Sequence, residues 1–247
     1  LMFDFNFSIY GFMLFWCLFF NALVILTTYD RYSFNRDEII GALLYENIGF
    51  ALGGKIMYFL FNPEPFSMKI FTNGGFYAYG CFIGMMLCLL LFCLEFKKSI
   101  KDMLLMFVTP VPLMYAINKI GCFLNGCCYG INYTGPFSIV YKYSSNAPLG
   151  VSLFPIQLLD FLSFFSVFIY MYINTLRNKF DFKTLGISFI ACGVYKFFLE
   201  FLRASHVGFF ITSYQLISIG LVIAGIIMIW YQKRLDSKMI KKSKLAR

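Results

Sequence analysis

Long apolar stretches separated by short polar segments recur along the whole chain. A helix needs about 20 predominantly apolar residues to cross the hydrocarbon core of a bilayer. Seven stretches approach or reach this length, and the fourth is the shortest. The pattern therefore predicts an all-α integral membrane protein with seven transmembrane helices, at Ser8–Thr28, Ile40–Phe61, Phe76–Phe96, Leu104–Asn118, Leu153–Asn174, Leu185–Phe201 and Ile211–Tyr231.

Positive charge is distributed unevenly between the two ends of these predicted helices. Of the 21 Lys and Arg residues, fifteen fall in the first, third and fifth loops and the C-terminal tail, whereas four fall on the opposite side. Cytoplasmic loops of membrane proteins carry an excess of Lys and Arg. We therefore expect the N-terminus outside and the C-terminus in the cytoplasm.

The composition agrees with a membrane protein and argues against a nucleic-acid-binding one. Hydrophobic residues make up 60% of the chain, charged residues 13%, and the mean hydropathy is +0.73. The net charge of +9 lies mostly in the last fifteen residues, which suit contact with anionic lipid headgroups. We predict one membrane domain over residues 1–232, a basic cytoplasmic tail over 233–247, and a small extracytoplasmic cap formed by residues 62–75 and 119–152.

Five charged residues interrupt the predicted membrane helices. A charge at the bilayer centre costs about 2.5 to 3.5 kcal/mol on insertion scales, so such residues are usually paired or line a wet cavity. Lys196 and Glu200 have i,i+4 spacing and Arg203 follows three residues later, which places all three on one helix face. A structural ion-pair ladder and a charged substrate cavity both fit this pattern. The five residues are Glu46, Lys55, Asp160, Lys196 and Glu200.

The segment Lys119–Gly130 is the most unusual in the chain. It reads KIGCFLNGCCYG and combines a cation, three thiols, three glycines and an asparagine between two apolar stretches. Glycine allows close backbone approach and left-handed conformations. Elsewhere, Gly53-Gly54 and Gly80 with Gly84 have the small-residue spacing of closely packed helices. We interpret Lys119–Gly130 as part of a functional site.

Six motifs in order resemble those of the prolipoprotein diacylglyceryl transferase family, over about Gly53 to Ser218. They are Gly53-Gly54-Lys55 with Tyr58, Gly74–Gly80 with Ile83-Gly84, Lys119–Gly130, Pro155–Leu158 with Asp160, Gly193–Arg203, and Gln215-Leu216 with Ser218. The resemblance implies transfer of the diacylglyceryl group of phosphatidylglycerol to the lipobox cysteine thiol of an exported prolipoprotein, with release of glycerol phosphate. It also implies the bacterial cytoplasmic membrane, an outer-leaflet active site, prolipoprotein signal peptides as partners and no cofactor.

The resemblance carries residue roles onto matching positions. Tyr79, Lys119 and Arg203 are the predicted catalytic residues, with Lys196 a further candidate cation for the phosphate and Glu200 as the residue that orients these cations. The family's histidine is Tyr79 here, and its signature arginine is Lys119. The predicted substrate-binding residues are Lys55, Gly74, Gly75, Gly80, Gly121, Cys122, Asn125, Gly126, Gly130, Gln157, Lys196 and Glu200.

The cysteines leave alternatives open. Cys122, Cys127 and Cys128 form a C-x4-C-C pattern, where the family has asparagine at the first position and glutamate at the second. The three thiols could fill space between helices, form a disulfide or act as reactive thiols. A metal site is the third and least favoured alternative, and no metal ligands are assigned, because a recognisable four-ligand zinc spacing is absent from the sequence. A relative with another acceptor or no catalysis, and a membrane thiol-redox protein, are the alternative functions.

Overall fold

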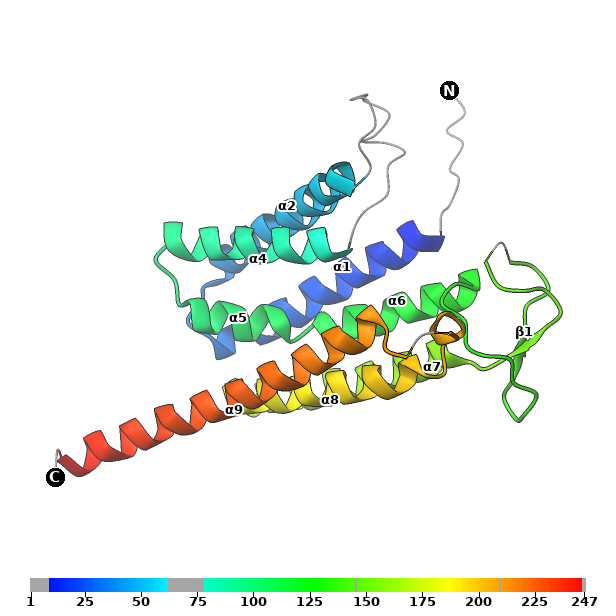
Figure 1. Cartoon of the computed structure of the whole chain (residues 1–247). Coiled ribbons are helices and arrows are strands. Elements are labelled where there is room, and N and C mark those ends of the chain that lie inside the picture. The colour runs from blue at the N-terminus through cyan, green and yellow to red at the C-terminus, as the bar shows by residue number, and fades with distance from the viewer. Residues whose placement is uncertain (1–8, 62–77, 145, 209, 246–247) are drawn as a thin grey trace, which may run out of the picture. The chain divides into compact units, whose positions relative to one another are not determined.

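The computed structural model describes residues 9–61, 78–144, 146–208 and 210–245. Helices dominate this part of the chain (Figure 1). The long helices are α1 (Ile9–Thr28), α2 (Arg36–Phe61), α4 (Ala78–Glu95), α5 (Ile100–Val108), α6 (Val111–Asn125), α7 (Ile156–Leu176), α8 (Phe182–Glu200) and α9 (Ser213–Leu245). Two 3-10 turns, Tyr29–Arg31 and Ala204–His206, and two short strands, β1 (Ile139–Val140) and β2 (Ser152–Leu153), complete it.

Six helical segments of the described chain are long and apolar enough to cross a membrane. They are Gly11–Arg31, Arg36–Phe61, Ile100–Asn125, Ile156–Leu176, Phe182–Glu200 and Ser213–Met239, and a shorter apolar helix covers Gly80–Glu95. All seven predicted positions therefore carry an apolar helix. The chain is a mostly helical protein that can pass through a membrane several times.

The fourth and the last predicted helices differ most from the structure. The fourth segment consists of α5 and α6, which are separated at Thr109 and Pro110 because Pro110 and Pro112 lack the N–H donors that a continuous helix requires. α6 continues to Asn125, so Lys119 lies within a helix and the irregular segment begins at Gly126. α9 runs on to Leu245 because the basic tail contains good helix formers and no glycine or proline.

The chain divides into two compact units, each described by itself. The inserted unit is Ile25–Phe107, and the main unit combines Leu1–Val24 with Val108–Arg247. In the inserted unit the end of α1, α2, α4 and α5 share a core that includes Ile25, Ile39, Phe92 and Met106. Burial of these side chains holds the four helices together.

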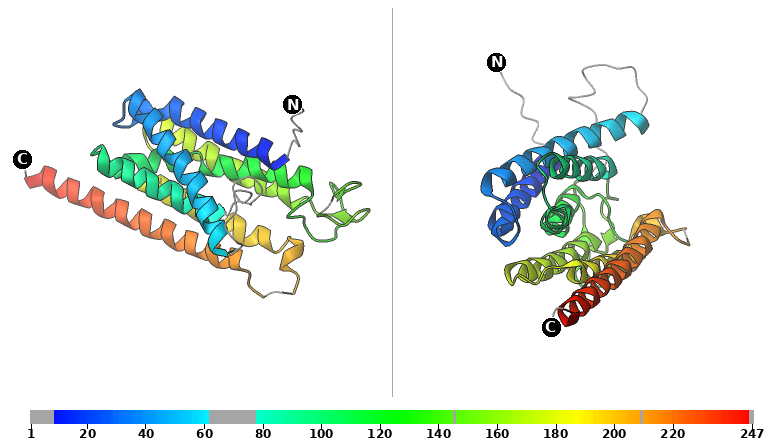
Figure 2. Two further views of the ribbon diagram at one scale, coloured as in Figure 1. Left: turned by 90° about the horizontal axis from the view of Figure 1, so that it is seen from above. Right: turned by 90° about the vertical axis from the view of Figure 1, so that its left-hand side faces the viewer.

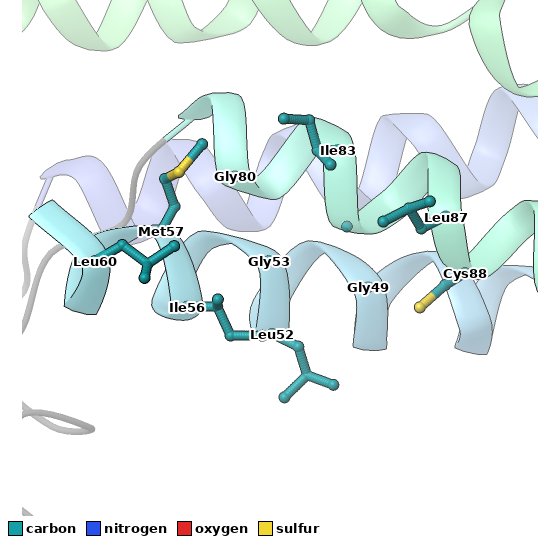
Figure 3. A pocket seen from close by; sticks show the side chains of 11 residues that line it. Gly49, Leu52, Gly53, Ile56, Met57, Leu60, Gly80, Ile83, Leu87 and Cys88 are labelled. Carbon is teal, nitrogen blue, oxygen red and sulfur yellow. The ribbon is translucent and has the colours of Figure 1, made fainter.

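Glycines bring α2 and α4 into backbone contact within the inserted unit. A Cβ at Gly53 would collide with the carbonyl oxygen of Gly80, and a Cβ at Gly49 with that of Gly84. The predicted role of Gly80 and Gly84 in close helix packing is confirmed. Beside this contact an apolar groove runs along the two helices, and Leu52, Ile56 and Ile83 extend from its walls (Figure 3).

The main unit contains α6, α7, α8 and α9 together with most of α1. Met13 and Cys17 of α1 pack against Leu113 and Ile117 of α6 and Phe168 of α7. α8 and α9 lie side by side along the whole length of α8 (Figures 1 and 2). Their backbones approach closely where Gly186 faces Gly225 and where Gly193 faces Ser218.

Candidate active site

Five charged side chains from three helices meet inside the main unit. Lys119 comes from α6, Asp160 from α7, Lys196 and Glu200 from α8, and Arg203 from the residues just after α8. The Lys119 ammonium lies 3.4 Å from the Asp160 carboxylate, and the Arg203 guanidinium donates a hydrogen bond to the same oxygen at 3.2 Å. We call these five residues the charge cluster.

Glu200 and Lys196 make the remaining ion pairs of the charge cluster. Lys196 Nζ lies 3.7 Å from Asp160 Oδ1 and 3.4 Å from Glu200 Oε2, while Arg203 Nε lies 3.4 Å from the same Glu200 oxygen. Lys196 and Glu200 therefore share one face of α8 as predicted, whereas Arg203 contacts Glu200 from the residues beyond the end of the helix. Three cations face two carboxylates, which leaves one net positive charge.

The charge cluster is almost fully buried and incompletely hydrogen-bonded. Its side chains are between 1% and 11% exposed. Among the described residues, Lys196 Nζ and Arg203 Nε make no hydrogen bond, and neither does either Glu200 carboxylate oxygen. Buried polar atoms without hydrogen bonds are costly and often mark places where a ligand binds. An excess of positive charge in such a place favours an anion.

Two tyrosines border these cations. Lys119 Nζ lies 4.9 Å from the centre of the Tyr115 ring, and Arg203 lies 5.6 Å from that of Tyr214. Lys196 lies within 6 Å of both ring centres. Cation–π contacts at this distance stabilise a cation without neutralising it. The two rings therefore turn their electron-rich faces toward the cations.

Local sequence determines how α6 ends next to the charge cluster. Gly126 has φ of 69°, its N–H bonds to the Phe123 carbonyl, and the Cys127 N–H bonds to the Cys122 carbonyl. This is a Schellman motif, for which a left-handed glycine is the usual residue. A Cβ at Gly126 would also collide with the Ser144 hydroxyl. Gly121 similarly allows Met13 of α1 to approach, since a Cβ there would lie 2.7 Å from Met13 Cγ.

Backbone pairing attaches the segment after Cys128 to the end of α8. Gly130 pairs with Arg203, and the Ile131 N–H donates to the Leu202 carbonyl. A Cβ at Gly130 would lie 2.5 Å from the Phe154 carbonyl oxygen, so glycine is required by space there. Buried Gln157 fixes the same loop, because its amide donates to the Cys127 carbonyl at 2.9 Å. The loop after α6 is thus attached both to Arg203 and to Gln157 of α7, which fixes the position of the Arg203 backbone.

The three signature thiols lie together. The Sγ atoms of Cys122, Cys127 and Cys128 are all within 4.8 Å of one another. Hydrogen bonds from the other two thiols, together with the charges of Lys119 and Arg203, lower the pKa of the Cys128 thiol. These thiols therefore border the charge cluster.

The predicted site residues divide between the two units. The main unit contains Lys119, Gly121, Cys122, Asn125, Gly126, Gly130, Gln157, Lys196, Glu200 and Arg203. Within it, the backbone carbonyl of Asn125 accepts hydrogen bonds from the side chains of Ser144 and Asn146. Lys55 is half-buried in α2 of the inserted unit, and Gly80 begins the close contact between α2 and α4. Gly74 and Gly75 lie outside the described residues, as does the side chain of Tyr79.

Sequence reasoning did not name as site residues three residues that the structure places in or beside the charge cluster. Asp160 contacts all three cations, although its only signals were a charge within an apolar stretch and its place in a motif. Tyr115 precedes Lys119 by four residues, a spacing that places both on one helix face. Tyr214 carried no signal, because its contact with Arg203 depends on how the chain turns between α8 and α9.

Comparison with known proteins identifies the family. The model of the family described as prolipoprotein diacylglyceryl transferase matches residues 1–231. The chain belongs to this family. A Clostridium perfringens phosphatidylglycerol–prolipoprotein diacylglyceryl transferase 2 is 31% identical over 227 residues, which cover 89% of this chain and 88% of that protein. The Clostridium tetani transferase is 30% identical over 90% of this chain and 92% of its own length.

More distant members of the prolipoprotein diacylglyceryl transferase family match as well. The transferase of Nitrosomonas europaea is 27% identical over 226 residues, covering 85% of this chain and 79% of that protein. The resemblance inferred from the motifs is therefore confirmed. Matches of this length include the inserted unit and the main unit.

Proposed function

We propose that the protein transfers the diacylglyceryl group from phosphatidylglycerol to the lipobox cysteine thiol of a prolipoprotein, and that the charge cluster holds the phosphate during the transfer. Family membership supports the reaction. The assignment of the site rests on three buried cations that face two carboxylates, in a cluster where several side-chain nitrogen and oxygen atoms make no hydrogen bond. A lipid phosphodiester supplies the missing anion.

The reaction explains why cations are needed. The thiol loses its proton, and the sulfur forms a bond with the glyceryl carbon that carries the phosphate. The bond between that carbon and the phosphate oxygen breaks, and its electron pair leaves with glycerol phosphate. The phosphate gains one negative charge during this step, so groups placed beside the leaving oxygen stabilise the transition state more than the bound lipid.

Individual roles follow from the geometry of the main unit. Lys119, Lys196 and Arg203 are the proposed phosphate contacts, and Asp160 and Glu200 position them. Gly121, Asn125, Gly126 and Gly130 shape the end of α6 and the loop that follows it. Cys122 in α6 and Gln157 in α7 border this loop, and Gln157 donates a hydrogen bond to it.

The proposed roles of Tyr79, Lys55, Gly74, Gly75 and Gly80 rest on the family motifs. A tyrosine has an unperturbed pKa of about 10 and is a weak base near pH 7. Its hydroxyl can instead donate a hydrogen bond to the phosphate or to the attacking thiolate. A cysteine thiol is already a few per cent ionised near pH 7, so the reaction depends less on a base than on stabilising the leaving group.

We further propose that the site opens to the outer leaflet of a bacterial cytoplasmic membrane, with the N-terminus outside and the tail of residues 233–247 inside. The distribution of Lys and Arg supports this orientation. The segments that join the helices near the charge cluster carry nearly fully exposed Phe137, Tyr143 and Phe210. Aromatic residues are enriched at membrane–water interfaces, which suits a cap that receives signal peptides.

A reconstituted reaction tests the proposal. The purified protein is mixed with phosphatidylglycerol and a lipobox peptide, and the mass of the peptide is measured by mass spectrometry. We expect a diacylglyceryl thioether from the wild type, at least 100-fold less from Lys119→Ala, and a smaller loss from Tyr79→Phe. An unmodified peptide with the wild type at every pH from about 6 to 9 contradicts the proposal, particularly if phosphatidylglycerol is still bound.

A further inference from the structure

Cys122, Cys127 and Cys128 are brought together by the way α6 ends. A Schellman motif joins residues five positions apart, and here its outer hydrogen bond runs from the Cys127 N–H to the Cys122 carbonyl at 3.0 Å. The C-x4-C spacing therefore places two thiols on one helix terminus. Gly126 in the left-handed conformation makes this possible.

Cys128 adds the third thiol through an unusual backbone conformation. Its φ is 54°, in the left-handed region that residues other than glycine, asparagine and aspartate rarely adopt. Holding such a residue there has a conformational cost that the surrounding structure must offset. The hydrogen bond from Gln157 to the Cys127 carbonyl and the pairing of Gly130 with Arg203 hold the loop on both sides. The result is a preformed group of three sulfur atoms.

We propose that Cys122, Cys127 and Cys128 bind a thiophilic divalent metal ion, with Zn²⁺ as the ion that fits best. Two sulfurs on one zinc ion at bonds of about 2.3 Å are about 3.8 Å apart. All three Sγ atoms lie within 4.8 Å of one another, so small rotations bring them onto one ion. Three protein ligands leave a fourth position for water or an incoming ligand, as in catalytic zinc sites.

Charge at the neighbouring residues favours this occupant. Three thiolates and one Zn²⁺ carry one net negative charge, whereas the charge cluster carries one net positive charge. Lys119 and Arg203 are close enough to Cys128 for electrostatic interaction. The positive charge cluster therefore favours a negatively charged metal group beside it, as it favours a phosphate. A metal site also explains why thiols lie together here, where isolated cysteines such as Cys192 are simply packed between helices.

Metal content provides the test, and it is independent of lipid transfer. The protein is purified with a thiol-free reductant, incubated with Zn²⁺, desalted and analysed for metal. We expect about one ion per chain in the wild type and in Cys88→Ser, and at least a tenfold weaker affinity in Cys122→Ser, Cys127→Ser and Cys128→Ser. Co²⁺ in place of Zn²⁺ should give a thiolate-to-metal charge-transfer band in the wild type that the three variants lose.

Circular dichroism and gel filtration show whether each variant is folded, so loss of metal from a folded variant counts in favour of the site. Metal content that is the same in the wild type and in the triple serine variant overturns the proposal. So does a reduced, folded wild type that retains no Zn²⁺ at micromolar free metal. A disulfide between Cys122 and a neighbour, found in protein whose reduced form binds no metal, would indicate a redox pair instead.

Discussion

Arg203 donates a hydrogen bond to Asp160 across 43 positions of sequence, with 3.2 Å between Nη2 and Oδ2. Asp160 lies on α7, one turn after its N-terminal end, and Arg203 lies just beyond α8. The same carboxylate group contacts Lys119 and Lys196. Asp160 is therefore the common partner of all three cations in the charge cluster.

Removing the charge of Asp160 should destabilise the protein. Asp160→Asn leaves three buried cations with one carboxylate, and breaking a buried ion pair from one side typically costs about 3 to 5 kcal/mol. We expect a clearly lower midpoint of thermal unfolding in detergent. The matched control is Asp30→Asn, whose carboxylate is 61% exposed and pairs with Arg31 at the surface. An equal midpoint for both variants would show that Asp160 does not hold the cations together.

Exchange of lysine and arginine should have unequal effects on transfer at positions 203 and 119. Arg203 contacts Asp160 with Nη2 and Glu200 with Nε, so a lysine at position 203 would replace two fixed nitrogens with one. Lys119 contacts one carboxylate. We expect Arg203→Lys to lower the turnover number about 10- to 100-fold, whereas Lys119→Arg retains most of it. Lipid-modified peptide, measured over time, gives both values, and a tolerated Arg203→Lys would refute the bridging role.

Close contact between α2 and α4 should make Gly53 intolerant of any side chain. Gly53→Leu forces the two helices apart, and overpacking of this kind typically costs about 1 to 3 kcal/mol. Gly220→Leu is the matched control, because nothing in the described structure lies within 4 Å of a Cβ at that glycine of α9. Thermal unfolding in detergent should separate the two variants. Equal stability would mean that the contact does not hold the helices together.

The length of the apolar stretches was sufficient to predict the helices but not their ends. The predicted fourth helix stopped at Asn118, because the polar and glycine-containing residues that follow looked irregular. In the structure α6 continues through Lys119–Asn125, because the ammonium group of Lys119 pairs with Asp160 and need not reach solvent. A partner on another helix is a tertiary feature, and hydropathy cannot reveal it.

The charge cluster was predictable in part. Spacing along the chain predicted that Lys196, Glu200 and Arg203 lie together, and ion pairs at 3.4 Å join them, although Arg203 lies beyond the end of α8. The convergence of Lys119 from α6 and Asp160 from α7 depends on how three helices pack. Likewise, the C-x4-C-C pattern lacked a four-ligand zinc spacing, yet the turn after α6 brings the three thiols together.

The central claim is tested most directly by measuring both products of one reaction. Wild-type protein, phosphatidylglycerol and a lipobox peptide should yield thioether-linked peptide and glycerol phosphate in equal amounts. A peptide with serine in place of the lipobox cysteine should yield neither. Glycerol phosphate released equally with both peptides would mean that the lipid is hydrolysed rather than transferred, and it would contradict the role of the charge cluster as a transferase site.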